Sequence, residues 1–137
     1  MTDREKEPVK YAVEVIAGAD PFAQLVGVKV EEAKDSYART SLTVKKEHCN
    51  AVGRTHGGVL FTLADETFAV AVHARGLHAF ALEIKINYFE ATRVGDVLSA
   101  EATPVDVRTR DSLWNVDVTN QKGQKIAQAQ GLAYHTR

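Results

Sequence analysis

The stretch "NAVGRTHGGVLFTLADETFAVAVHARG", residues 50–76, decides the fold, because it predicts one long helix that is apolar almost all round. The expected helix covers residues 57–75, and Gly76 is a natural residue to end it. A helix with apolar side chains around most of its circumference is buried on most sides. Two features do not suit a plain core helix: the glycine pair that opens it, and a carboxylate, Asp65, two turns in.

The sequence on both sides of this helix alternates between apolar and polar residues, which predicts β-strands. Short turns, such as Gly95-Asp96 and the one around Gly123, separate the later strands, so consecutive strands are expected to pair antiparallel. One curled antiparallel sheet of five to six strands around one central helix is an α+β fold that satisfies both patterns. The expected strands cover residues 26–31, 36–44, 84–88, 97–108, 114–119 and 125–135.

The residues of two of these strands also predict how the strands pack. Pro104 lacks a backbone N–H, so we expect it at a bulge or an edge position within residues 97–108. Small residues share one face of the last strand, and we expect them to let the central helix approach closely. These residues are Ala127, Ala129, Gly131 and Ala133.

Length and composition limit the class of protein. The 137 residues are expected to form one domain, residues 1–137, in which residues 1–21 are a short helical segment with a helix beginning at Pro8. A hydrophobic content of 45% argues against disorder, and a net charge of −1 does not suit a nucleic-acid-binding surface. The charged start "MTDREKEPVK" and the lack of a long apolar run favour a cytoplasmic protein that does not bind membranes. The single Cys49 excludes an internal disulfide, and its spacing to the histidines predicts no metal site.

Gly57 and Gly58 make chemical sense at the first turn of a helix. The first N–H groups of a helix have no internal partner and carry the positive end of its dipole. Without Cβ atoms in the way, a substrate oxygen can approach these N–H groups directly, as in an oxyanion hole. The alternative is that the glycines only allow the loop to pack tightly against the helix.

Asp65 has two interpretations. An ionised carboxylate on a mostly buried helix is unfavourable unless it is paired, and its helical neighbours supply no cation. It lies either in a narrow solvated stripe with Thr62 and Glu66 or in an apolar pocket. The solvated stripe suits Glu66 better than it suits Asp65. In a pocket its pKa would be raised, and it could act as a base or a nucleophile.

The spacing between Gly57 and Asp65 has a consequence for assembly. Eight residues along a helix correspond to about 12 Å, whereas a base and an oxyanion donor must both lie within about 3 Å of one reacting carbonyl group. If both residues are catalytic, each active site combines Gly57 of one subunit with Asp65 of another. Two such helices related by a two-fold axis give two equivalent sites, so the catalytic interpretation predicts an obligate homodimer.

Two polar residues, Asn50 and His56, lie in the loop that leads into the helix. Each can hydrogen-bond a substrate oxygen or orient a water molecule. The alternative for His56 is a loop histidine that hydrogen-bonds to the backbone.

The pattern Asn50-x-x-Gly53-x-x-His56-Gly57-Gly58, with Asp65 nine residues after the histidine, resembles the hot-dog-fold acyl-CoA thioesterases. Among them it is similar to the PaaI-like family, which is associated with phenylacetate degradation. The resemblance extends from about residue 22 to the C-terminus and includes "INYFEATRVGD" and "VDVTNQKGQKIAQAQG". It implies the hot-dog fold and hydrolysis of an acyl-CoA to free acid and coenzyme A, without a separate cofactor or metal. Tetramers built from two dimers are common in this family, so the resemblance also implies a homotetramer.

Carried over residue by residue, the resemblance assigns roles at four catalytic positions. Asp65 is the general base or nucleophile, and the backbone N–H of Gly57 polarises the thioester carbonyl. His56 lies beside it, and Asn50 helps to position the reacting groups. The substrate-binding residues expected around them are Gly58, Phe61, Phe68, Ala81 and Arg93.

The sequence departs from the family pattern in two places. Several relatives carry a serine or threonine on the strand after the helix to hold the attacking water, whereas the corresponding positions here are Ala79 and Ala81. The family often has Arg-Pro before the Gly-Asp turn, where this chain reads "FEATRVGD". Four arginines are candidates to pair with the phosphates of coenzyme A, and the alternative for each is a solvated surface side chain. They are Arg75, Arg93, Arg108 and Arg110.

Two other functions are alternatives to an acyl-CoA thioesterase for aryl-acetyl, aromatic or medium-chain groups. One is a non-catalytic acyl-CoA sensor on the same fold, although the residues before the first strand are too few for a DNA-binding output domain. The other is an acyl-thioester dehydratase, which requires a different histidine motif with a nearby proline that "RTHGGVLF" lacks.

Overall fold

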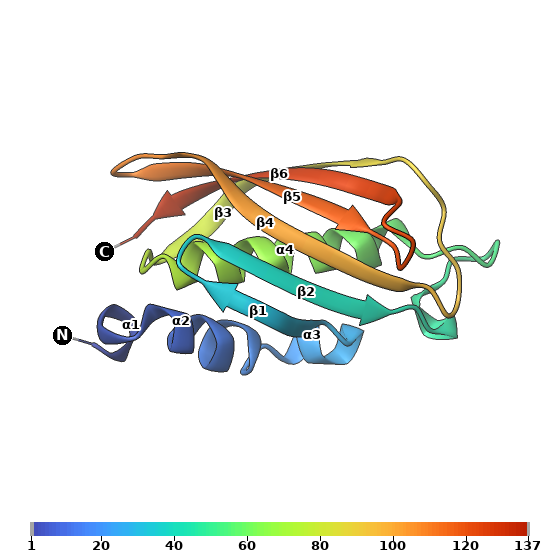
Figure 1. Ribbon diagram of the computed structural model, residues 1–137, viewed down its shortest axis with the longest axis horizontal. Helices are drawn as coiled ribbons and strands as arrows, with labels where there is room; N and C mark the ends of the chain where they lie inside the picture. Colours follow the sequence, from blue (N-terminus) through green and yellow to red (C-terminus); the bar gives the residue numbers. More distant parts are fainter. Residues whose placement is uncertain (1, 137) are drawn as a thin grey trace.

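One long helix, α4 (Gly57–Ala74), packs against the inner face of a six-stranded antiparallel sheet in the computed structural model, which describes residues 2–136 (Figure 1). The strand order is β1-β2-β4-β5-β6-β3, so β1 and β3 form the two edges. The predicted α+β arrangement is confirmed. The strands are β1 (Lys29–Lys34), β2 (Tyr37–Thr43), β3 (Ala79–Tyr88), β4 (Val97–Val107), β5 (Asp111–Thr119) and β6 (Lys125–His135).

The predicted limits of α4 are also confirmed. The chain leaves the helix at Gly76, which adopts a φ of +95° that favours glycine. Leu63 and Val70 on α4 have no exposed surface, so this helix fills the core as expected. No helix among residues 2–136 combines the length and the apolar character needed to cross a membrane. The shorter helices are α1 (Asp3–Lys6), α2 (Pro8–Tyr11), α3 (Pro21–Val26), the π-helix η1 (Ala12–Ala17) and the 3₁₀ helix η2 (Lys46–His48).

The small residues of β6 face α4, as predicted. A Cβ atom on Gly131 would lie only 2.1 Å from Cε2 of Phe68, so the phenyl ring of the helix occupies the space above this glycine. Ala127, Ala129 and Ala133 are buried on the same face of the strand. The central helix can therefore lie close to the sheet at this point because β6 has no bulky side chains there.

The N-terminal region differs from the prediction. The first strand begins at Lys29, and Val26 belongs to α3 instead. Asp20 starts this helix, since its Oδ1 accepts hydrogen bonds from the N–H groups of Phe22 and Ala23 at 3.0 and 3.1 Å. The Asp20-Pro21 pair is a typical helix start that the valine alternation concealed, whereas the helix beginning at Pro8 is confirmed.

The predicted irregularity at Pro104 is a β-bulge. The register of β4 against β5 shifts between Pro104 and Asp106, where the missing N–H of proline interrupts the ladder. The remaining pairs of β4 and β5 are regular, so the ladder between these two strands is interrupted at one place only.

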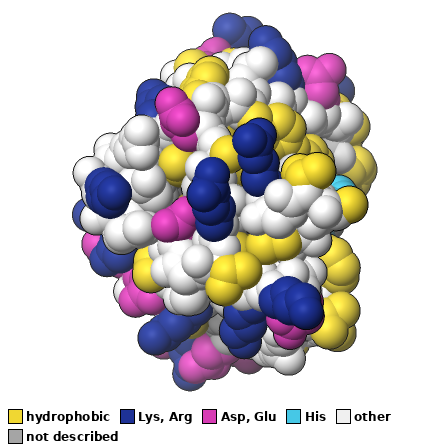
Figure 2. All heavy atoms as spheres, turned by 90° about the vertical axis from the view of Figure 1, so that its right-hand side faces the viewer, with side chains coloured by type: hydrophobic (Ala, Val, Ile, Leu, Met, Phe, Trp, Pro, Cys, Tyr) yellow, Lys and Arg dark blue, Asp and Glu magenta, His cyan; other side chains and the backbone are white. Residues whose placement is uncertain are grey.

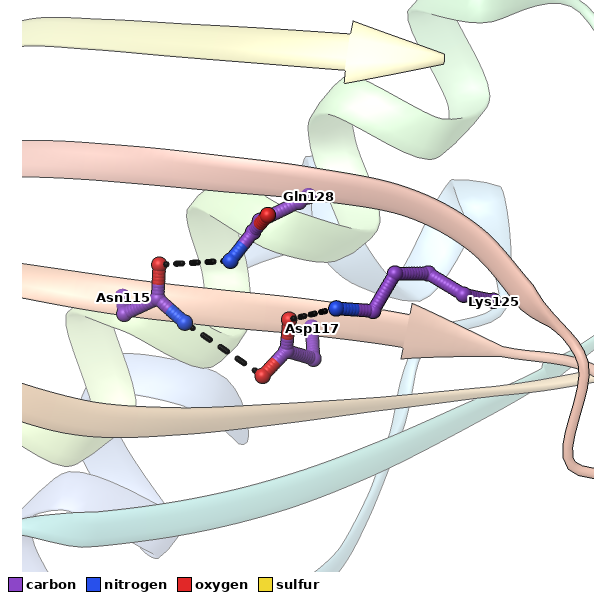
Figure 3. A network of polar contacts seen from close by, with 4 residues as sticks. All are labelled: Asn115, Asp117, Lys125 and Gln128. Atoms are coloured by element: carbon purple, nitrogen blue, oxygen red, sulfur yellow. Dashed lines mark hydrogen bonds and ion pairs between the residues drawn. The ribbon is translucent and has the colours of Figure 1, made fainter. Parts of the chain in front are cut away.

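The outer face of the sheet is polar. Gln128 Nε2 donates to Asn115 Oδ1 at 3.2 Å, and Asn115 Nδ2 donates to Asp117 Oδ2 at 3.3 Å (Figure 3). The ammonium group of Lys125 lies 3.4 Å from Asp117 Oδ1. Side chains at the alternate positions of β5, such as Val116, are buried against α4. The sheet thus has one dry face and one wet face, as its period of two predicts.

The two ends of α4 lie at opposite ends of the molecule. The helix starts where the loop 49–56 and the segment 89–96 meet, on the right in Figure 1, and both chain termini lie at the other end. The N–H of Thr55 donates to the carbonyl oxygen of Thr92 at 2.9 Å, and the two threonine hydroxyls share a 2.6 Å hydrogen bond. These bonds join the loop and the segment around the start of the helix.

Candidate active site

His56 caps the first turn of α4. Its Nδ1 accepts a hydrogen bond from the backbone N–H of Gly58 at 2.9 Å, so the neutral ring carries its proton on Nε2. The interpretation of His56 as a histidine bonded to the backbone is therefore confirmed for one ring nitrogen. The residue is exposed, and its Nε2–H remains as a side-chain donor at the start of the helix.

Gly57 presents an open backbone N–H. Within residues 2–136 this N–H has no hydrogen-bond acceptor, whereas the N–H of Gly58 is taken by His56. The Tyr88 hydroxyl donates to the Gly57 carbonyl oxygen at 3.0 Å, and a Cβ atom at position 57 would lie 3.3 Å from the tyrosine ring. Of the two glycines, Gly57 is the one that keeps a free donor at the positive end of the helix dipole.

A pocket opens beside Gly57 at this start of the helix. Asn50 contributes to it, but Asn50 Oδ1 already accepts hydrogen bonds from the N–H groups of Val52 and Arg54, each at 3.1 Å. Asn50 therefore shapes the loop and keeps its Nδ2 group for other partners. Further lining residues are Arg54, Thr55, Leu60, Tyr88, Phe89, Glu90, Ala91 and Thr92.

Arg54 and Tyr88 were not predicted as site residues. The alternation of Tyr88 with Ile84 and Ile86 predicted its strand, but nothing local indicates a contact with Gly57, which is 31 residues away. Arg54 lies inside the predicted motif between Asn50 and His56, which was the available signal. Figure 2 shows this end of the molecule, where Lys and Arg side chains are spread among hydrophobic ones. The exposed basic residues of the loops at this end are Lys45, Lys46, Arg54, Arg93 and Lys122.

Asp65 lines a second pocket, between α4 and the strands β3 and β6. Burial, and after it the negative charge of Asp20, raises the pKa of Asp65. Phe68 and Ala81, two of the predicted substrate-binding residues, line the same pocket. Asp65 thus faces a mostly apolar pocket and is not part of a solvated stripe.

Glu66 is buried, so the expectation that it lies in a solvated stripe is wrong. Its side chain belongs to the buried part of α4, and the residue is only 6% exposed. Burial, followed by the contact with the Asp20 carboxyl, raises the pKa of Glu66 to about 8. The cover over Glu66 comes from the N-terminal segment, which the helical spacing of the sequence could not reveal.

The remaining predicted residues lie outside the two pockets. Phe61 is 37% exposed on α4, and Arg93 is exposed at the end of the molecule where Gly57 lies. Arg75 and Arg108 lie at the other end, where they contact Ser36 and Asp106, each at 2.8 Å. Arg110 lies in the same turn between β4 and β5 as Arg108, and its carbonyl oxygen accepts from the N–H of His135 at 2.8 Å. Arg93 is therefore the one predicted arginine near the start of α4.

His73 lines the Asp65 pocket with both ring nitrogens occupied. Nδ1 donates to the carbonyl oxygen of Ala69 at 2.7 Å, and Nε2 accepts from the N–H of Ala79 at 3.5 Å. Burial lowers the pKa of His73, which favours this neutral form. Within the described residues, no three His, Cys, Asp or Glu side chains gather as a metal site would require.

The pocket beside Gly57 and the pocket beside Asp65 share no lining residue. Both residues lie on the continuous helix α4, and eight residues correspond to about 12 Å along its axis. The N–H of Gly57 and the carboxyl group of Asp65 therefore lie in two separate pockets of one chain.

Comparisons with known proteins show which family this chain resembles. The family model described as the thioesterase superfamily matches residues 52–127. A provisionally named esterase of Archaeoglobus fulgidus is 34% identical over 97% of this chain and 86% of its own length. The acyl-coenzyme A thioesterase PaaI of Escherichia coli is 28% identical over 84% of this chain and 82% of its own length.

Solved structures show the same fold. The E. coli PaaI protein from the phenylacetic acid degradation operon superposes with a TM-score of 0.85 at 24% identity, over 97% of this chain and 99% of that one. A hypothetical thioesterase of Streptococcus pneumoniae, crystallised with coenzyme A, superposes with a TM-score of 0.78 at 30% identity, over 80% of this chain and 86% of that one. The predicted hot-dog fold is confirmed.

Proposed function

This chain belongs to the thioesterase superfamily, and from that premise we propose that it hydrolyses an acyl-CoA at a site shared by two subunits. The observation that carries the proposal is the separation of two complementary groups on α4. Gly57 offers an open N–H in one pocket, Asp65 offers a half-buried carboxylate in another, and the pockets share no residue. A second copy related by a two-fold axis brings one of each together.

The start of α4 binds the thioester carbonyl oxygen. The N–H of Gly57 and the Nε2–H of His56 donate to this oxygen, and their bonds strengthen as negative charge develops on it. The cap between His56 Nδ1 and the N–H of Gly58 fixes both donors before the substrate arrives. Asn50 Nδ2 is a third donor in the same loop, and Gly58 contributes by leaving the approach free of a side chain.

Asp65 of the neighbouring subunit attacks from its own pocket. As a base, its carboxylate takes a proton from water; the water oxygen bonds to the carbonyl carbon, the C–S bond breaks, and coenzyme A leaves as the thiol after that proton is returned. As a nucleophile, its carboxylate oxygen bonds to the carbonyl carbon and the C–S bond breaks, which gives a mixed anhydride and the thiolate of coenzyme A. Water then hydrolyses the anhydride to the free acid and Asp65, and the proton that this water releases goes to the thiolate. Asp65 and His73 are the polar side chains of this pocket, and His73 has both nitrogens occupied. Asp65 is therefore the group that holds the water.

The edge strand β3 supplies a surface for the second copy. It has a hydrogen-bonded neighbour on one side only, and its Phe80 and Leu82 are 55% and 57% exposed. An edge strand with exposed apolar side chains favours pairing with another chain. We assign the homodimer to this edge, and the homotetramer to two such dimers.

The substrate divides between the two halves of the site. An aryl-acetyl, aromatic or medium-chain acyl group suits the apolar pocket beside Asp65, where Phe68 and Phe80 lie. Arg54, which lines the pocket beside Gly57, and Arg93, in the segment joined to the same loop, are placed to attract the phosphates of coenzyme A. Coenzyme A enters as part of the substrate, with no other cofactor, and a role in cytoplasmic breakdown of phenylacetate fits an aryl-acetyl substrate.

Steady-state hydrolysis of phenylacetyl-, benzoyl-, octanoyl- and acetyl-CoA, followed by a thiol reagent that detects released coenzyme A, tests this function. We expect Asp65→Ala and the shape-preserving Asp65→Asn to lower kcat at least ~100-fold, because each removes the base or nucleophile. Wild-type turnover by Asp65→Ala would overturn the assignment. Binding of acyl-CoA without release of coenzyme A would identify a sensor instead.

A further inference from the structure

Glu66, the residue after Asp65, has no part in the reaction described above. It is only 6% exposed, and its Oε1 has no hydrogen-bond partner among the described residues. A buried carboxyl oxygen without a partner is unfavourable, so its place beside Asp65 requires an explanation.

The neighbour of Glu66 is a second carboxyl group. The Asp20 carboxyl lies close enough to Glu66 to raise the pKa of Glu66, and Asp20 Oδ1 caps α3 by accepting from the N–H groups of Phe22 and Ala23. Two carboxyl groups in contact need one proton between them. The two N–H groups favour the charged form of Asp20, so the proton belongs on Glu66, which then donates to Asp20.

We propose that Glu66 is a positioning residue for the thioesterase reaction: as a neutral acid it donates a hydrogen bond to Asp20 and holds the segment 20–26 against the turn of α4 that carries Asp65. This inference rests on the proposed role of Asp65. The segment matters to Asp65 because the charge of Asp20 acts on both carboxyl groups.

The arrangement makes the site sensitive to alkaline pH. The charged groups that face Glu66 are Asp20, at the start of α3, and Asp65, on α4 itself, and both are negative. The pKa of Glu66 is about 8 because of its burial and these neighbours. Above this pH Glu66 loses its proton, two carboxylates face each other, and the segment 20–26 is repelled from the helix.

The experiment compares kcat and KM from pH 6 to pH 10 in the wild type, Glu66→Gln and Glu66→Met, with spontaneous thioester hydrolysis subtracted. Gln keeps a donor that never ionises, so we expect kcat within about twofold of wild type at pH 7 and no loss centred near pH 8. Met fills the space without a donor, so we expect kcat to fall at least about tenfold at pH 7 with KM changed much less. Asp20 still caps α3 in both variants, and circular dichroism verifies the fold.

Either of two results would overturn the inference: a Glu66→Met enzyme with the kcat of wild type, or a Glu66→Gln enzyme that keeps the alkaline loss. The Asp65→Ala variant separates the failure of this inference from the failure of the proposed function. If Asp65→Ala is active, the proposed role of Asp65 is wrong, and the premise of this inference falls with it. If Asp65→Ala is inactive while Glu66→Met has the kcat of wild type, only the role of Glu66 is wrong. Infrared spectroscopy of the unliganded protein gives a readout without turnover. A protonated carboxyl band at pH 7 that is absent in Glu66→Gln is expected, and its presence in both would contradict the inference.

Discussion

The start of α4 and the turn that carries Asp65 lie on one helix, yet different parts of the chain build them. The contacts at the start are mostly local: His56 bonds to Gly58, and Asn50 bonds to Val52 and Arg54. The surroundings of Asp65 come from the N-terminal segment and from β3 and β6. The first region offers the backbone N–H of Gly57, which never titrates, and the second offers carboxyl groups whose charge depends on packing. Fixed geometry and adjustable charge are thus separated along one helix.

The strongest test of the first region removes its donor without disturbing the helix. Gly57→Pro lacks the N–H, and proline is favoured at the first position of a helix. We expect kcat to fall by about 10²–10³, the typical loss for one oxyanion-hole donor. Gly57→Ala is the matched control, since it introduces the same 3.3 Å contact with Tyr88 but keeps the N–H. Equal losses in both variants would show that the contact, and not the donor, matters.

Mixing subunits tests whether the two regions meet across a dimer. Asp65→Ala and Gly57→Pro subunits, unfolded and refolded together, form mixed dimers in which one of two sites is intact. Random pairing in equal amounts should restore about one quarter of the wild-type activity. A mixture of Asp65→Ala with Asp65→Asn is the control and should restore none. No recovery from mixed dimers that have been shown to form would place the whole site within one chain.

The pH dependence of stability tests the second region. The pKa of Glu66 is raised to about 8 in the folded protein from the ordinary glutamate value of 4.5. Between these values the folded state keeps a proton that the unfolded state has lost, so rising pH lowers the free energy of unfolding by up to about 5 kcal/mol and has no further effect above pH 8. Urea unfolding should therefore give Glu66→Gln a growing stability advantage over wild type from pH 5 to pH 8. A difference that stays constant over this range would mean that Glu66 is charged throughout.

The smallest expected effect belongs to the tyrosine that lies over Gly57. Tyr88→Phe removes one hydrogen bond to the Gly57 carbonyl oxygen but keeps the ring, so about 0.5–1.5 kcal/mol is at stake and kcat should fall less than about tenfold. Tyr134→Phe, on an exposed tyrosine of β6, is the control and should not change kcat. A loss as large as that of Gly57→Pro would mean that Tyr88 touches the substrate.

The same contrast explains what the sequence could predict. Features set by neighbours in the chain were found: the limits of α4 from its apolar run and Gly76, the bulge from Pro104, and the close approach to β6 from its small residues. Features that depend on distant segments were missed or misread. Glu66 was assigned to solvent because its cover, Asp20, lies 46 positions earlier. Tyr88 could be placed on a strand, but its contact with Gly57 depends on how that strand lies against the helix.

The contact between Phe68 and Gly131 links the packing of β6 to the pocket beside Asp65. The ring of Phe68 fills the space above Gly131 and also lines the pocket beside Asp65. A larger residue at position 131 would push this ring away from the sheet, and a smaller one at position 68 would open the room that the ring now fills. If the pocket beside Asp65 holds the acyl group, as we propose, the size of acyl group that a descendant accepts can drift through changes in β6, a strand that supplies none of the proposed reacting groups.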